Sequence, residues 1–220
     1  MPDYGTIYRE SMGRIMTLVN NQNVDTPVPA CPGWTVKDVV AHLCGAIRDI
    51  AKGDTDEVGE DAWTARQVED YRHRSLTDIG AEWHLRANSS PWAFQAFGQV
   101  MMADIITHEF DIRGAIGNTQ GRELPAVTSA SLFYLNALDY VFKQDGIPPL
   151  RILTEDKTLE LGEGGPQGTV EMSWWEAMRV ASGRRSRDQV RALRWTGDPD
   201  TWLEHLFIFD PRETDLAEQE

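Results

Sequence analysis

Apolar side chains recur every three or four positions along the first two-thirds of this 220-residue chain, and this spacing constrains the fold most. Between Tyr4 and Asn20 they form the stripe of one amphipathic helix, and between Thr35 and Gly53 they form the stripe of a second. Thr35 and Asp38 have the spacing of a capping box at the start of the second helix. The beginning of the chain is therefore predicted to be helical.

Further helical segments follow, separated by glycine, serine and proline. We predict helices over 63–71, 76–87, 97–116 and 126–142, with breaks at the acidic loop 53–60, at Ser89-Ser90-Pro91 and at Gly117-Asn118. Four or five long helices in succession are typical of a helical bundle. The sequence therefore assigns residues 1–147 to a bundle domain.

The pattern changes after Ile147, where two prolines end the helical spacing. Short strands are predicted at 150–153, 158–161 and 169–172, with the glycine-rich segment 162–168 as a wide hairpin between the last two. Ser173 and Ser186 have the spacing of N-caps for two more helices, and a last helix is predicted over 200–207. Residues 148–220 are therefore expected to form a small α+β domain.

The composition limits the possible partners. The chain has 35 Asp and Glu against 21 Lys and Arg, a net charge of −14, and such a surface repels nucleic-acid phosphates and anionic membranes. Neither a secretory signal nor a membrane-length apolar run is found, so we expect a cytoplasmic protein that binds small molecules. Cys31 and Cys44 are too few for a disulfide framework, and we expect both to be reduced.

One helix face has the spacing of a metal site. Asp104, His108 and Asp111 lie at i, i+4 and i+7, within about 60° of one another around the predicted helix. A carboxylate and an imidazole one turn apart can hold a divalent ion, although the same spacing is common in surface ion pairs. His42 lies on the shoulder of its helix's apolar stripe, so it either points into a central cleft or bonds a backbone carbonyl.

Two motifs resemble those of a known family. The run 29–43, PACPGWTVKDVVAHL, resembles the N-terminal signature of the mycothiol-dependent maleylpyruvate isomerase family, in the DinB/YfiT-like metalloenzyme superfamily. The segment 104–111, DIITHEFD, is similar to the family's second signature, and 181–184 and 195–198 resemble its C-terminal domain. The resemblance implies a DinB-like four-helix bundle followed by a small α+β domain.

The resemblance also implies a site. His42, Asp104 and His108 would bind one divalent metal, zinc being the usual assignment, with an open position of the kind found in catalytic sites. Family members usually have Glu in place of Asp104, so the shorter carboxylate either reaches the metal, leaves water between, or favours a different metal. Asp111 is expected to orient the imidazole of His108, or alternatively to pair with an arginine.

Residues 184–194 contain five arginines, which form a basic run in an otherwise acidic chain. Its members are either solvated or paired with carboxylates, including pairs that bridge the two domains, or one of them places its guanidinium on the substrate. By resemblance that residue is Arg184, which would bind a substrate carboxylate and stabilise a developing enolate or oxyanion. The run comprises Arg184, Arg185, Arg187, Arg191 and Arg194.

The leading hypothesis is a divalent-metal-dependent enzyme that uses a small thiol, such as mycothiol, for S-transfer or cis-trans isomerisation of a small electrophilic or carboxylate substrate. One alternative keeps the metal without the thiol, as a hydrolase or lyase of small-molecule metabolism. Another is a non-catalytic ligand-binding protein on the same scaffold. The chain is expected to be a monomer or a homodimer.

Overall fold

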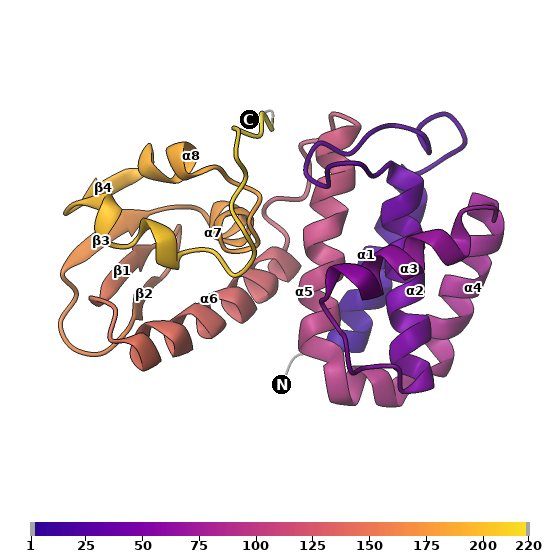
Figure 1. Ribbon diagram of the computed structural model, residues 1–220, viewed down its shortest axis with the longest axis horizontal. Helices are drawn as coiled ribbons and strands as arrows, with labels where there is room; N and C mark the ends of the chain where they lie inside the picture. Colours follow the sequence, from indigo (N-terminus) through magenta and orange to yellow (C-terminus); the bar gives the residue numbers. More distant parts are fainter. Residues whose placement is uncertain (1–2, 219–220) are drawn as a thin grey trace. The chain divides into compact units, whose positions relative to one another are not determined.

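The computed structural model describes residues 3–218, which form two compact units, residues 3–120 and 121–218 (Figure 1). The first unit is helical and the second combines helices with a four-stranded sheet, so the predicted α+β class is confirmed. Within the described residues, no helix has the length and apolar character that crossing a membrane requires.

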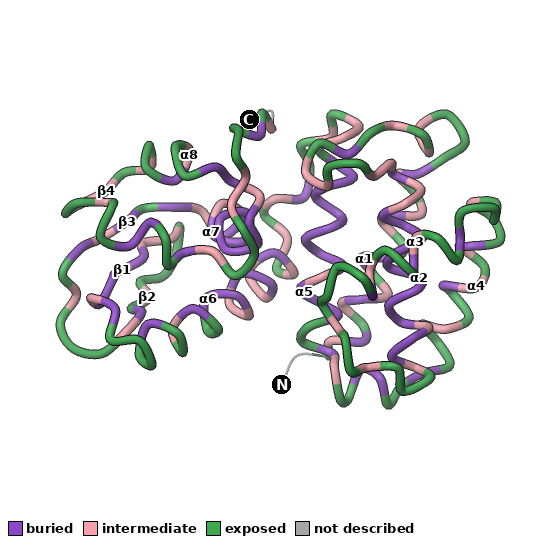
Figure 2. Tube along the Cα trace, viewed as in Figure 1, coloured by how far each residue is buried: buried purple, intermediate pink, exposed green. Residues whose placement is uncertain are grey.

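The first unit is a bundle of four longer helices with a shorter one beside them. Helix α1 packs along α5, and α2 contacts α3, α4 and α5. Figure 2 shows buried residues along the inner faces of α2 and α5. The helices are α1 (Tyr4–Leu18), α2 (Val36–Lys52), α3 (Asp61–Tyr71), α4 (Leu76–Ser89) and α5 (Pro91–Ala115).

Helix α2 illustrates how the sequence sets an element. The Thr35 hydroxyl accepts from the amide of Asp38, whose carboxylate accepts from the amide of Thr35, which completes the predicted capping box. At the other end Gly53 has φ of 82°, the left-handed conformation that favours glycine. The predicted apolar stripe is buried throughout, at Val36, Val39, Val40, Leu43, Ile47 and Ile50.

Helix α5 begins earlier than the sequence pattern predicts. The predicted break at Ser89-Ser90-Pro91 is confirmed, because α4 ends at Ser89 and Ser90 is not helical, but α5 begins at Pro91 rather than at residue 97. Proline fits there because the first helical N–H has no partner within the helix in any case. The helix is therefore long enough to carry both the packing contacts with α1 and the polar residues of its C-terminal half.

In the second unit, β1 (Leu150–Leu153) lies inside the sheet, whose order is β2-β1-β3-β4. It pairs antiparallel with β2 (Thr158–Leu161) and parallel with β3 (Gly168–Glu171), and β4 (Arg194–Thr196) pairs antiparallel with β3. The predicted hairpin between β2 and β3 is therefore wrong. The buried strand β1 needs hydrogen-bond partners on both edges, and the glycine-rich segment crosses it to supply the second.

Helix α6 (Pro125–Asp145) packs against β2 and α7 (Trp174–Ala181), so it belongs to the second unit. The sequence placed the division at residue 147, whereas the compact units divide after residue 120. A buried hydroxyl, that of Ser131, donates to the carbonyl of Trp174 at 2.5 Å and helps to join α6 to α7.

The end of the second unit is less helical than predicted. Helix α8 (Arg187–Arg191) is capped by Ser186 with a complete capping box, as its sequence indicates. The helix predicted over 200–207 is instead two short 3-10 turns, η1 (Pro199–Thr201) and η2 (Leu203–His205).

Candidate metal centre

Helices α2 and α5 bring three predicted ligands together within the first unit. His42 Nε2 lies 3.5 Å from Asp104 Oδ2, and His108 Nε2 lies 3.5 Å from Asp104 Oδ1. One ligand atom from each of the three residues lies within 4.8 Å of the others. We call these residues the His–Asp–His cluster. The two histidines are buried and the Asp104 side chain is one-third exposed, so the cluster is open at the carboxylate.

A buried amide orients His42. Gln67, on α3, places Oε1 2.8 Å from His42 Nδ1, and its amide nitrogen donates to Asp49 Oδ2 at 3.1 Å. Asp49 also accepts from Arg48 Nε at 2.7 Å. The Gln67 oxygen is an acceptor for Nδ1, and this contact turns Nε2 toward Asp104.

His108 is oriented in the same way by a carboxylate of its own helix. Its Nδ1 lies 2.9 Å from Asp111 Oδ2, and the side chain of Asp111 is fully buried. Both imidazoles therefore turn Nε2 toward Asp104 while Nδ1 is held by an oxygen acceptor. Metal-ligating histidines have this arrangement, and two nitrogens with a carboxylate suit a divalent cation such as zinc. The donor set thus fits the predicted metal.

A tight turn forms one wall of this site. The amide of Trp34 donates to the carbonyl of Cys31 at 3.0 Å, with Pro32 and Gly33 between them. Gly33 has φ of 85°, so the four residues form a type II turn. The Trp34 ring lies 5.4 Å from the His42 ring and 6.2 Å from the His108 ring, centroid to centroid, and so covers both imidazoles.

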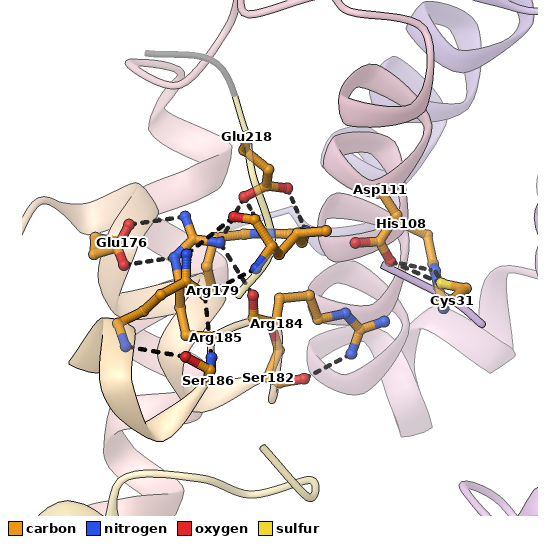
Figure 3. A network of polar contacts seen from close by, with 12 residues as sticks. Cys31, His108, Asp111, Glu176, Arg179, Ser182, Arg184, Arg185, Ser186 and Glu218 are labelled. Atoms are coloured by element: carbon orange, nitrogen blue, oxygen red, sulfur yellow. Dashed lines mark hydrogen bonds and ion pairs between the residues drawn. The ribbon is translucent and has the colours of Figure 1, made fainter. Parts of the chain in front are cut away.

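The same turn brings a thiol to the far nitrogen of His108 (Figure 3). Cys31 Sγ lies 3.3 Å from Asp111 Oδ2 and 3.8 Å from His108 Nδ1. Cys31, Trp34 and Gln67 were not predicted from the sequence as site residues. The Pro-Gly pair before the His42 helix marks the turn, but nothing in the local pattern of Gln67 indicates its contact.

Glu109 faces away from the cluster and ties α5 to α1. It accepts hydrogen bonds from Ser11 at 2.6 Å and from Arg14, and it forms an ion pair with Arg113. Burial would raise the pKa of Glu109, but the hydrogen bonds from Arg14, Ser11 and Arg113 outweigh it and hold the pKa below its usual value. Glu109 therefore stabilises the bundle.

The basic run lies in the second unit and pairs with carboxylates there. Arg185 binds Glu176 and Glu218 in a buried network (Figure 3). Arg184 Nη1 donates to the carbonyl of Ser182 at 2.7 Å. The expectation of pairing is confirmed within the unit, where the further pairs are Arg187 with Glu204, Arg191 with Asp188 and Asp200, and Arg194 with Glu171.

Comparison with known proteins supports the resemblance. Residues 8–112 match the model of the mycothiol maleylpyruvate isomerase N-terminal domain, and the match contains the whole His–Asp–His cluster. This region of the chain is therefore similar to that domain. No curated protein matches the chain.

The fold also resembles that of the solved mycothiol-dependent maleylpyruvate isomerase, with a TM-score of 0.58 and 14% identity. A histidine-to-alanine mutant of that isomerase gives 0.57 and 13%. Each comparison covers 84% of this chain and 90% of the other. The shared fold therefore extends beyond the family domain into the second unit.

Proposed function

We propose that this chain is a divalent-metal-dependent enzyme that uses a small thiol, such as mycothiol, for S-transfer to or cis-trans isomerisation of a small electrophilic substrate with a carboxylate. One observation carries the proposal. In a domain similar to that of this family, both buried histidines turn Nε2 toward Asp104 while oxygen acceptors hold Nδ1. Zinc is the metal that this donor set favours.

Different residues of the first unit have different proposed roles. When bound, a divalent cation would lower the pKa of a thiol, so that thiolate is available at neutral pH. His42, Asp104 and His108 would hold the cation, while Asp111 and the Gln67 amide keep the two imidazoles in the correct tautomer. The Trp34 ring shields the imidazoles from water, and the partly exposed Asp104 marks the side from which substrates enter.

Arg184 is the proposed ligand of the substrate carboxylate. A guanidinium binds a carboxylate through two parallel hydrogen bonds and stabilises negative charge that develops beside it. The residue before Arg184 must be glycine, because Gly183 has φ of 75° and a Cβ there would lie 2.6 Å from the carbonyl oxygen of Asp210. The family resemblance of residues 181–184 supports this role.

Metal analysis of protein purified without chelators tests the proposal first, and about one equivalent per chain is expected. The double variant His42→Ala, His108→Ala should lose both the metal and thiol transfer. His84→Ala is the matched control, because His84 is exposed on α4. Unchanged turnover in the double variant would contradict the proposal.

The thiol requirement is tested separately, by assaying candidate substrates with and without added mycothiol. Metal-dependent turnover that needs no thiol would favour a hydrolase or lyase. Protein that retains no metal would favour a non-catalytic binding protein on this scaffold.

A further inference from the structure

Three different donor groups meet on the side of His108 that faces away from the His–Asp–His cluster. Cys31 Sγ, His108 Nδ1 and Asp111 Oδ2 form a triangle with sides of 3.8, 3.3 and 2.9 Å. We propose that Cys31, His108 and Asp111 form a second cation site for a thiophilic divalent metal, and that it shares the His108 imidazole with the first. We call these three residues the thiol cluster.

The distances fit a tetrahedral ion. With Zn–S near 2.3 Å and Zn–N and Zn–O near 2.0–2.1 Å, ligand atoms around tetrahedral zinc are about 3.3–3.6 Å apart. The observed separations of 2.9 to 3.8 Å lie within about 0.5 Å of these values, so small side-chain movements suffice. A structural metal site is expected to have this kind of near-complete geometry.

Rigid elements hold the three donors in place. Cys31 opens the type II turn, and its amide donates to the carbonyl of Val28 at 2.9 Å. His108 and Asp111 are one turn apart on α5, and the Asp111 side chain is fully buried. Cys31 is only partly buried, so a cation can approach from its side. The site is therefore largely organised before any ion binds.

The chemistry of the donors selects the ion. A thiolate beside an imidazole favours Zn²⁺, Cd²⁺ or Co²⁺ over Mg²⁺ or Ca²⁺, which prefer oxygen ligands. Binding replaces two protons, one on the Cys31 thiol and one on His108 Nδ1, and both pass to solvent. His108, then an imidazolate, would bind one cation through each of its two nitrogens, while Asp111 would exchange its hydrogen bond for a bond to the metal.

The other cysteine provides a matched control. Cys44 is buried on α2, its thiol donates to the carbonyl of Ile79 at 3.6 Å, and burial raises its pKa to about 11. It belongs to neither group of potential ligands found among the described residues. Substitution at Cys44 removes a thiol from the chain and leaves both clusters intact.

Titration of the metal-free full chain with Co²⁺ tests the proposal, because thiolate ligation adds a near-ultraviolet charge-transfer band to the visible absorption of bound cobalt. Equilibrium dialysis with metal analysis counts the bound ions. We expect two equivalents of cobalt per chain, and we expect the charge-transfer band to appear when cobalt binds the thiol cluster. Cys31→Ser should lose the band and one equivalent, and Cys44→Ser should keep both. His42→Ala should lose the other equivalent and keep the band.

A single cobalt equivalent in the wild-type chain, or a band that persists in Cys31→Ser, would overturn the second site. Asp111→Asn is a further check if Cys31→Ser fails to fold, since it should weaken the equivalent that carries the band. Failure here is distinguishable from failure of the proposed function, because Cys31→Ser and His42→Ala each remove a different equivalent.

Discussion

Gly45 makes room for the residue that orients a proposed metal ligand. A Cβ at Gly45 on α2 would lie 2.6 Å from Cβ of Gln67 on α3, so glycine allows the two helices to approach closely at this point. The approach places the buried Gln67 amide against His42 Nδ1. A glycine in a helix interior is unfavourable relative to alanine, and the hydrogen bond to His42 explains its presence here.

Replacing Gln67 by Leu should therefore weaken metal binding without removing a ligand. Loss of an outer hydrogen-bond partner to a metal-bound histidine typically lowers metal affinity about 10–100-fold. Competition with a chromophoric chelator measures the change, and Gln95→Leu, at an exposed position on α5, is the control. An unchanged affinity in Gln67→Leu would show that His42 does not depend on this amide.

Substitution of Asp104 tests whether its carboxylate, which is shorter than the usual Glu, is a direct metal ligand. Its two oxygens each lie 3.5 Å from one imidazole nitrogen, so the side chain reaches both histidines. Asp104→Ala should lower metal affinity more than the outer-partner change at Gln67, by more than about 100-fold, while Asp104→Glu should retain binding. Equal affinities for Asp104→Ala and wild type, measured by the same chelator competition, would place the carboxylate outside the coordination sphere.

At the scale of elements, the Glu109 network joins α1 to α5 by buried charge. Glu109→Gln leaves Arg14 and Arg113 without their carboxylate and should cost about 3–5 kcal/mol of unfolding free energy. Urea denaturation measures the loss. Glu57→Gln, on an exposed loop with a 3.6 Å ion pair to Arg66, should change stability little.

The lowered pKa of Glu109 predicts that the stability of the protein depends on pH. The folded pKa of Glu109 is below its ordinary value of 4.5, so its contribution to stability is present above pH 4.5 and is lost as the pH falls through the folded pKa. Wild type should therefore lose more stability between neutral pH and acid than Glu109→Gln does. Parallel melting-temperature profiles for the two proteins would contradict this.

The helices of the first unit were largely predictable because local signals determine them: an apolar stripe, a capping box and a closing glycine define α2. An apolar stripe does not show which element it packs against. The contacts of α6 with the sheet, and the position of β1 between β2 and β3, were therefore not predicted. The same holds for the site. His42, Asp104 and His108 were found from spacing and family resemblance, whereas Cys31 contacts Asp111, which lies 80 positions further along the chain.

At the scale of the molecule, metal binding should stabilise the first unit specifically, since the whole His–Asp–His cluster lies within it. A ligand present at 100 times its Kd adds about 2.7 kcal/mol to the unfolding free energy of the species that binds it. Hydrogen exchange of peptides from residues 3–120, with and without Zn²⁺, measures this. His42→Ala should show no such gain, and equal protection of metal-free and loaded wild type would argue against the centre.

The loop before α2 is closed by its own backbone. The amides of Val28, Val36 and Lys37 donate to the carbonyls of Trp34, Thr26 and Val24, and Trp34 donates back to Cys31. Slow exchange of these amides would be the signature of such a closed loop, in which the amides of Val36 and Lys37 come from the first turn of α2. The wall that carries Cys31 and Trp34 would then last as long as the helix it precedes, and an arriving ion would meet a surface that is already in place.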